Sequence, residues 1–127
     1  MNYLAHFYLA NGDKGLMVGN FIADHIVGNQ YLDFPEAIQK GVIQHRAIDT
    51  FTDEHPVVLE SKKRLRPIFH KFSPVIVDVF YDYLLAKRWK QYSKQNLEEF
   101  TLNAYRVIHE YHHLIPDKAA YMFGYME

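Results

Sequence analysis

Three pairs of polar residues, each spaced four apart along the chain, are the groups in this sequence best placed to do chemistry together. Residues four apart share one face of an α-helix, so each pair presents two polar groups on the same side. The pairs lie in segments that are otherwise largely apolar: Asn20 with Asp24, His45 with Asp49, and Asp78 with Asp82. His6 adds an imidazole in the middle of a further apolar segment. A protein core must satisfy such groups, because burying an unpaired charge is very costly.

A divalent cation would satisfy these groups. Several carboxylates gathered in one core repel one another, and a cation cancels that repulsion. Imidazole nitrogen with carboxylate oxygen suits Mn²⁺, Fe²⁺, Zn²⁺ or Mg²⁺. The chain has eight histidines, fifteen acidic residues and no cysteine, so thiolate ligands and disulfides are excluded. A bound divalent ion lowers the pKa of its water and polarises a phosphoryl oxygen, and a nearby carboxylate can take the proton of that water, which favours phosphoester hydrolysis.

A structural interpretation of each pair stays open. A single His or Asp on an apolar face is more often satisfied by a backbone group or by a tyrosine hydroxyl, and the chain has ten tyrosines. Three such pairs on three segments favour the metal interpretation. No Gly-rich phosphate loop and no arrangement for covalent catalysis is evident in the sequence.

Helical periodicity predicts the elements that must position these residues. We expect helices or short helical segments over residues 3–10, 16–27, 35–52, 57–69, 73–92, 97–114 and 117–127. Pro35 and the Ser73-Pro74 pair are typical of helix starts. No segment alternates as a strand does, and no repeat or linker divides the chain. The sequence predicts an all-α protein, a single compact bundle of five to seven helices forming one domain over residues 1–127.

The expected helix over residues 73–92 carries a long apolar stripe beside its two acids. The stripe is made of Val75, Ile76, Val79, Phe80, Tyr83 and Leu84. Such a stripe is typical of a helix that packs against its neighbours.

Composition narrows the class of protein. Apolar residues make up 49% of the chain and aromatic residues 16%, which argues against disorder. The formal net charge of −1 gives no support for a nucleic-acid binder. No apolar run reaches the ~18 residues of a membrane span, and no signal-peptide pattern is present. We expect a cytoplasmic protein with neither a nucleic-acid nor a membrane partner.

Four stretches carry a family resemblance. In order, they are Met1-Asn2-Tyr3-Leu4-Ala5-His6, Gly19-Asn20-Phe21-Ile22-Ala23-Asp24, His45-Arg46-Ala47-Ile48-Asp49 with Thr52-Asp53, and Asp78-Val79-Phe80-Tyr81-Asp82 with Tyr83-Leu84. Together they resemble the bacterial acyl carrier protein phosphodiesterase (acyl carrier protein hydrolase) family. The resemblance runs through the first ~90 residues, and its specificity comes from several linked motifs rather than one.

This resemblance implies a fold, a reaction and a set of site residues. The fold would be HD-domain-like, and the enzyme would remove the 4′-phosphopantetheine arm from holo-acyl carrier protein, with Mn²⁺ favoured over Mg²⁺ or Fe²⁺. The implied metal ligands are His6, Asp24, His45, Asp49 and Asp78. The implied catalytic carboxylates are Asp24, Asp49 and Asp82. Asn20 would orient the substrate or a ligand, and Arg46 would pair with a phosphate oxygen.

A basic cluster offers a surface for the same partner. Its members are Lys62, Lys63, Arg64 and Arg66. Complementary charge would steer an acidic carrier protein to them, although a charge run of this kind is more often a solvated helix face.

The end of the chain and the substrate leave alternatives open. Members of the family continue past this chain's end, and residues 121–127 are apolar and aromatic, so we expect either missing helices or a homodimer through this end. The alternative functions are an HD-type phosphohydrolase acting on a nucleotide or another small phosphodiester, and a catalytically idle helical protein that binds a carrier protein.

Overall fold

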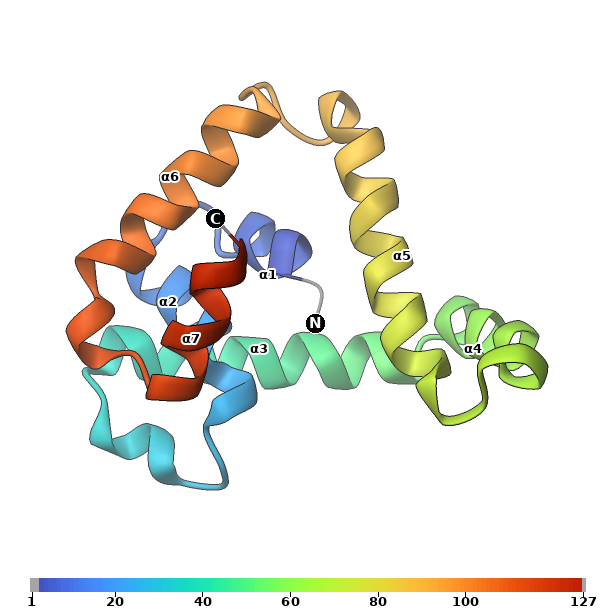
Figure 1. Cartoon of the computed structure of the whole chain (residues 1–127), viewed down its shortest axis with the longest axis horizontal. Coiled ribbons are helices and arrows are strands. Elements are labelled where there is room, and N and C mark those ends of the chain that lie inside the picture. Colours follow the sequence, from blue (N-terminus) through green and yellow to red (C-terminus); the bar gives the residue numbers. More distant parts are fainter. Residues whose placement is uncertain (1–2, 127) are drawn as a thin grey trace.

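The computed structural model describes residues 3–126, with side chains up to residue 124, and every regular element within them is helical. The α-helices are α1 (Tyr3–Leu9), α2 (Lys14–Ile22), α3 (Glu36–Glu54), α4 (Pro56–Phe69), α5 (Ser73–Lys87), α6 (Leu97–Glu110) and α7 (Asp117–Met126). Short 3-10 turns join them: η1 (Ala23–His25), η2 (Gln30–Asp33), η3 (His70–Phe72), η4 (Trp89–Gln91) and η5 (His112–Leu114). The predicted all-α fold is confirmed (Figure 1).

Helices α2 and α3 cross with their backbones in contact. A Cβ atom on Gly19 would lie 2.3 Å from the carbonyl oxygen of Ile38, and one on Gly41 would lie 2.7 Å from the Cα of Gly19. Only glycine allows so close an approach. The predicted inner face of α3 is buried as expected, with Ile38, Val42 and His45 all turned inward. The crossing therefore brings the polar groups of α2 and α3 together.

The core gathers around this crossing. Helices α1 and α6, the turn η1 and helix α7 supply the other walls of the core (Figure 1). Its largest members include Phe7, Met17, Phe21, Ile22, Ile38, Ile108 and Phe123. Helix α7 folds back onto its own chain, because the ring of Phe123 packs against Phe21 and Tyr105. The expected homodimer through this end therefore gains no support from the fold.

Three predicted helices end several residues earlier than expected; one of them, predicted over residues 97–114, ends at Glu110 and is followed by η5. The expected helix over residues 16–27 ends at Ile22, and η1 follows it. Asp24 therefore lies in a 3-10 turn rather than one α-helical turn beyond Asn20. The expected helix over residues 73–92 ends at Lys87, and its last part is η4.

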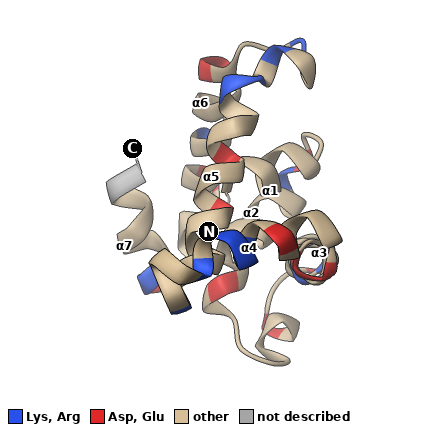
Figure 2. Cartoon of the chain, turned by 90° about the vertical axis from the view of Figure 1, so that its right-hand side faces the viewer, with Lys and Arg blue, Asp and Glu red and all other residues tan. Residues whose placement is uncertain are grey.

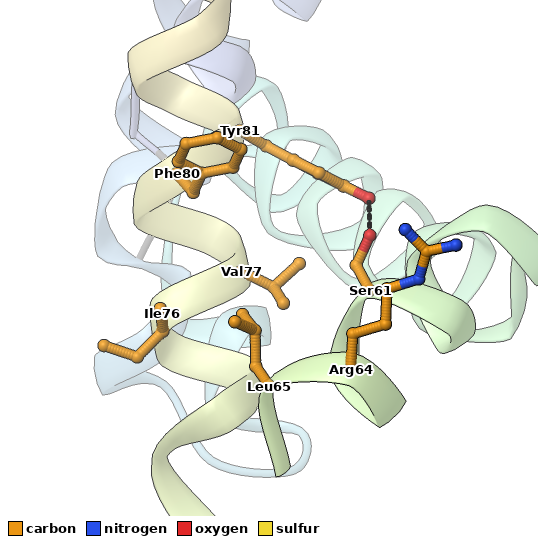
Figure 3. Close-up of a pocket in the computed structure, with 7 residues that line it drawn as sticks. All are labelled: Ser61, Arg64, Leu65, Ile76, Val77, Phe80 and Tyr81. Atoms are coloured by element: carbon orange, nitrogen blue, oxygen red, sulfur yellow. Dashed lines mark hydrogen bonds between the residues drawn. The ribbon is translucent and has the colours of Figure 1, made fainter. Parts of the chain in front are cut away.

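Helices α4 and α5 pack against each other and form an arm beside this core (green to yellow in Figure 1). The arm has a small interior of its own, with Val58 and Val77 buried and the hydroxyls of Ser61 and Tyr81 2.7 Å apart. A pocket of about 250 Å³ opens between the two helices and is lined almost entirely by apolar groups (Figure 3).

Most of the predicted apolar stripe on α5 is exposed. Val75, Val79, Phe80 and Tyr83 each have about half of their surface exposed. The stripe is real, but α5 packs mainly on α4 and α1, and these two neighbours cover only part of its circumference. Within residues 3–126, no helix combines the length and the hydropathy that crossing a membrane requires.

Candidate metal centre

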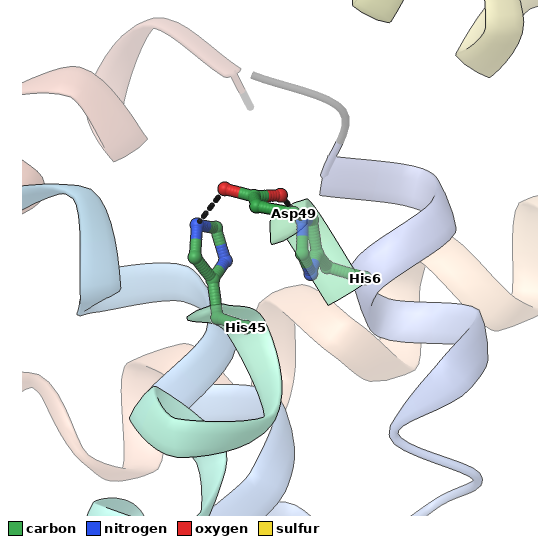
Figure 4. Close-up of side chains that lie close together, drawn as sticks. All are labelled: His6, His45 and Asp49. Atoms are coloured by element: carbon green, nitrogen blue, oxygen red, sulfur yellow. Dashed lines mark hydrogen bonds and ion pairs between the residues drawn. The ribbon is translucent and has the colours of Figure 1, made fainter. Parts of the chain in front are cut away.

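Three side chains from two helices meet at one point beside the core. His6 comes from α1, and His45 and Asp49 come from α3 (Figure 4). The ligand atoms that they offer all lie within 4.8 Å of one another. The two imidazole rings are stacked, with their centroids 4.0 Å apart. The spacing of four residues on α3 puts both of its members on the face that meets α1.

The carboxylate of Asp49 bridges the two imidazoles, and a second carboxylate contacts one of them. Asp49 Oδ1 lies 3.1 Å from His6 Nε2, and Asp49 Oδ2 lies 3.0 Å from His45 Nε2. Asp24, from η1, places its Oδ1 3.1 Å from the same nitrogen of His45. The His side chains are 1% and 5% exposed, whereas the side chains of Asp49 and Asp24 are 44% and 39% exposed. The cluster is closed on its imidazole side and open to solvent on its carboxylate side.

The proton on His6 has a defined position. Asn20 Oδ1 lies 2.8 Å from His6 Nδ1, and the Asn20 amide nitrogen donates to the carbonyl oxygen of Leu16 and to Gln44 Oε1. A backbone carbonyl can only accept, so the amide nitrogen must face Leu16 and the amide oxygen must face His6. His6 Nδ1 therefore carries the hydrogen. When His6 is neutral, the lone pair of Nε2 points at Asp49 Oδ1; when the ring carries a second proton, Nε2 donates to Asp49 Oδ1 instead.

A lone pair that faces a carboxylate oxygen at this distance needs a positive charge between the two atoms. A second proton on His6 would supply one, and a cation bound by both atoms would supply another. His45 presents a similar demand, because its single Nε2 faces both Asp24 and Asp49. Two imidazole nitrogens and carboxylate oxygens form a donor set that divalent Mn, Fe, Zn or Mg accepts. The residues present therefore fit the predicted metal.

One ring nitrogen in the cluster lacks a partner. His45 Nδ1 is buried without a hydrogen bond to any residue in the described part of the chain. Buried polar atoms are normally paired, so the polar contacts of Nε2 and the stacking on His6 hold this ring in place.

The charges of the cluster shift one another's ionisation. Burial of His45 opposes its positive charge, but hydrogen bonds to Asp24 and Asp49 raise the pKa of this imidazole to about 9. The same hydrogen bond lowers the pKa of Asp24. Burial also opposes the charge of Asp49, and hydrogen bonds from His45 and His6 nevertheless hold its pKa well below the usual range. At neutral pH without metal, His45 therefore carries a proton between two ionised carboxylates, and a metal ion would replace that proton.

The two predicted acids of α5 lie apart from this group. Asp82 accepts the backbone N–H of Leu4 and of Ala5 at 2.9 and 3.0 Å, so it covers the first turn of α1. Burial raises the pKa of Asp82, and these two hydrogen bonds oppose the shift. Neither Asp82 nor Asp78 is among the ligand atoms that converge within residues 3–126.

Two residues next to His45 on α3, Gln44 and Arg46, make contacts that the sequence did not predict. Gln44 was missed as a site residue, although it lies three positions after Gly41 and so shares the inner face of α3. Arg46, predicted to bind phosphate, donates to the carbonyl oxygen of Ile26 and lies over the ring of Tyr31 at 5.2 Å.

Two members of the predicted basic cluster on α4 already have acidic partners. Lys62 Nζ lies 3.0 Å from Asp53 Oδ1, and Arg64 Nε lies 3.1 Å from Glu60 Oε1. Lys63 is exposed, as is Arg66.

Fold and site together define an all-α protein with a candidate divalent-metal centre built from helices α1 and α3 and the turn η1. The chain belongs to the acyl carrier protein phosphodiesterase family, whose family model matches residues 1–127. The resemblance seen in the sequence is thereby confirmed, whereas the HD-type relationship stays a prediction.

Relatives with the name acyl carrier protein phosphodiesterase share more than a third of the aligned residues. The protein of Enterobacter sp. (strain 638) is 37% identical over 106 residues, which are 83% of this chain and 55% of that relative. The Klebsiella pneumoniae protein is 38% identical over 109 residues, 85% of this chain and 56% of the relative. The Yersinia pestis protein is 36% identical over 91 residues, 72% and 47% respectively. The chain thus spans about half the length of the curated relatives it matches. No solved structure matches it.

Proposed function

We propose that this chain carries the metal centre of a phosphodiesterase that cleaves the phosphopantetheine–serine linkage of holo-acyl carrier protein and releases the apo form. The names of the relatives supply the substrate. The orientation of His6 is the observation that carries the chemistry, because Nδ1 is held by Asn20 and Nε2 faces Asp49 Oδ1 across 3.1 Å. Mn²⁺ is the proposed ion, with Mg²⁺ and Fe²⁺ as alternatives. The cysteine-free composition fits a cytoplasmic setting.

Each residue of the cluster has a role in this proposal. His6, His45 and Asp49 would hold the ion, and Asp24 would be the fourth protein ligand. When bound, the ion supplies positive charge that offsets the phosphodiester charge and acidifies water. The water oxygen bonds to phosphorus, the bond from phosphorus to the serine oxygen breaks, and the serine oxygen takes a proton. Asp24, open to solvent, is positioned to remove the proton of the attacking water.

The two acids of α5 have different roles in the proposal. Both oxygens of Asp82 are engaged by α1, so we assign it to holding His6 in position rather than to proton transfer. Asp78 stays a candidate ligand that a metal-binding measurement on Asp78→Ala would test.

The test is to incubate the chain with holo-carrier protein and Mn²⁺ and to follow the mass of the carrier protein. We expect loss of the mass of the phosphopantetheine arm, abolished by a chelator. Asp49→Ala should lower the rate by roughly 100-fold or more, since it removes a proposed ligand that contacts both imidazoles. Asp53→Ala is the matched control, because Asp53 is an exposed acid on the same helix that pairs only with Lys62 among the described residues.

Three outcomes would contradict the proposal. A carrier protein that keeps its arm at high enzyme concentration, while a relative from Klebsiella pneumoniae removes it, would exclude the activity for this chain. Faster cleavage of a small generic phosphodiester would favour the nucleotide-type alternative. A purified protein that binds no Mn²⁺ by elemental analysis, and whose Asp49→Ala variant is equally stable, would indicate the catalytically idle alternative.

A further inference from the structure

The connection between α5 and α6 forms an open concavity of about 840 Å³ with a basic lining. Four cations contribute to the lining within eight consecutive positions, and all four are exposed: Lys87, Arg88, Lys90 and Lys94. No acidic residue lines the concavity. Figure 2 shows blue ribbon at this end of the molecule, where α5 passes into α6. We call these eleven residues, 86–97 without Tyr92, the basic bowl.

The floor of the basic bowl is held by specific contacts. Trp89 is buried, its indole nitrogen donates to the carbonyl oxygen of Gln95 at 2.7 Å, and its ring lies 4.7 Å from that of Phe100. Ser93 Oγ accepts the backbone N–H of Gln95, and Asn96 caps α6. These contacts give the connection a defined shape, so the cations are presented on a formed surface rather than on a free loop.

The cations of the bowl lack internal acidic partners. Within residues 3–126, no ion pair is described for any of the four. Glu98 and Glu99 follow in the first turn of α6, outside the lining. Their negative charges interact favourably with the positive N-terminal end of the helix dipole. On α4, by contrast, Lys62 and Arg64 are already paired with acids of this chain. The bowl therefore groups four cations without a described acidic partner, against two on α4, Lys63 and Arg66.

The bowl is also joined to the helix that carries His6. The hydroxyl of Tyr8 on α1 donates to the carbonyl oxygen of Tyr92, and its ring packs edge-on against Trp89. Lys87 follows Asp82 by five residues on α5, a separation of ~7.5 Å along the helix axis. Because Asp82 of α5 covers the first turn of α1, the helix that leads into the bowl also contacts the helix that carries His6.

We propose that the basic bowl is the docking surface for an acidic face of the carrier protein. The identity of the partner rests on the proposed function. The acidic character of the partner's docking face is inferred from the positive charge of the bowl. Opposite charges across a protein–protein contact steer association and set orientation. This proposal places the principal docking surface at residues 87–94, whereas the sequence alone suggests residues 62–66 of α4.

Binding of apo-carrier protein tests the proposal, because this form lacks the arm and needs no metal chemistry. The variant is Lys87→Glu with Lys90→Glu, and the matched control is Lys40→Glu with Lys118→Glu, which makes the same change in net charge elsewhere. We expect the bowl variant to bind at least about tenfold more weakly, with a shallower dependence on salt, whereas the control binds as the parent does. Thermal unfolding of both variants verifies that they are folded.

The possible failures are distinguishable. If the bowl variant binds as tightly as the parent, or if Lys63→Glu with Arg66→Glu on α4 weakens binding more, the docking proposal is wrong even when the parent cleaves holo-carrier protein. A parent that binds no carrier protein, or prefers an RNA or DNA oligonucleotide at the bowl, also overturns it. If the parent binds through the bowl and leaves the arm in place, docking stands and the proposed catalytic function fails.

Discussion

At the scale of single residues, the amide of Asn20 organises the candidate site. Its nitrogen donates to a backbone carbonyl of its own helix and to Gln44, and Gln44 in turn donates to the carbonyl oxygen of Leu9. The amide oxygen is left for His6, so the tautomer of that imidazole is set by backbone groups. Hydrogen bonds of this kind, one step removed from a metal, orient its ligands.

Asn20→Ala should weaken metal binding without removing a ligand. The His6 ring would lose the acceptor that keeps its hydrogen on Nδ1, so we expect Mn²⁺ affinity to fall by about 10- to 100-fold. Titration calorimetry measures the change. Asn29→Ala is the control, because Asn29 is exposed and its side chain makes no cap hydrogen bond. Unchanged affinity in Asn20→Ala would show that the ring needs no such support.

The ionisation of His45 predicts how stability depends on pH in the metal-free protein. Because its folded pKa is about 9 and its ordinary value is 6.5, the stabilisation it gives is complete below pH 6.5 and is lost as pH rises to about 9. The lowered pKa of Asp49 has the opposite consequence, with stabilisation lost as pH falls below about 3.8. Thermal unfolding with a chelator should show the loss between pH 6.5 and 9, on the order of 1–2 kcal/mol given the exposure of both carboxylates.

His45→Gln separates this residue from the other titrating groups. The variant should be less stable than the parent at pH 6 and should lose less stability between pH 6.5 and 9. Parallel curves for the two proteins would mean that His45 does not carry a stabilising proton.

Spacing and family resemblance together predicted His6, Asp24, His45 and Asp49, which the structure brings together, and they also predicted residues that lie elsewhere. A spacing of four says which helix face a side chain shares, and it does not say what that face meets. Asp82 has the right chemistry, yet its oxygens meet the N–H groups of α1. Gln44 showed no chemical signal of its own, because its role exists only where α2 crosses α3.

At the scale of elements, the glycine contact between α2 and α3 sets the distance between the residues that each helix contributes. Without a side chain at Gly19 or Gly41, the helices approach until backbone meets backbone. Periodicity predicted the buried face of α3, but it could not predict this close approach. It also missed the end of α2 at Ile22, because residues 23–27 remain apolar enough to continue the pattern.

Gly19→Ala should force α2 and α3 apart. The new Cβ would lie 2.3 Å from a carbonyl oxygen and 2.5 Å from the Cα of Gly41, so we expect a loss of about 1–3 kcal/mol in the free energy of unfolding. Mn²⁺ affinity should fall as well, because Asn20 and Gln44 would separate.

Gly124→Ala is the matched control, measured by the same chemical denaturation. Gly124 lies in α7 with nothing within 4 Å of an added Cβ, so this change should be neutral or stabilising by up to about 1 kcal/mol. Equal effects at the two glycines would contradict the backbone contact.

At the scale of the whole molecule, the described residues divide into the core around α2 and α3 and the arm of α4 and α5. The sequence predicted the helices of both parts, but hydrophobic periodicity does not say which neighbour covers which stripe. Val79 and Phe80 look like core residues in the sequence, and about half of each is exposed. Asp82 is the polar residue that ties the arm to α1, through two backbone hydrogen bonds.

Because Asp82 accepts two backbone hydrogen bonds from α1, the amides of that first turn report how firmly the arm packs against α1. If α5 moves away from α1, the amide hydrogens of Leu4 and Ala5 lose their acceptor and exchange with solvent deuterium. Amides in the middle of α3 should stay protected by the hydrogen bonds of their own helix. Such an opening would also loosen the first turn of α1, which precedes His6, so the position of the His6 imidazole should depend on how firmly the arm packs against α1.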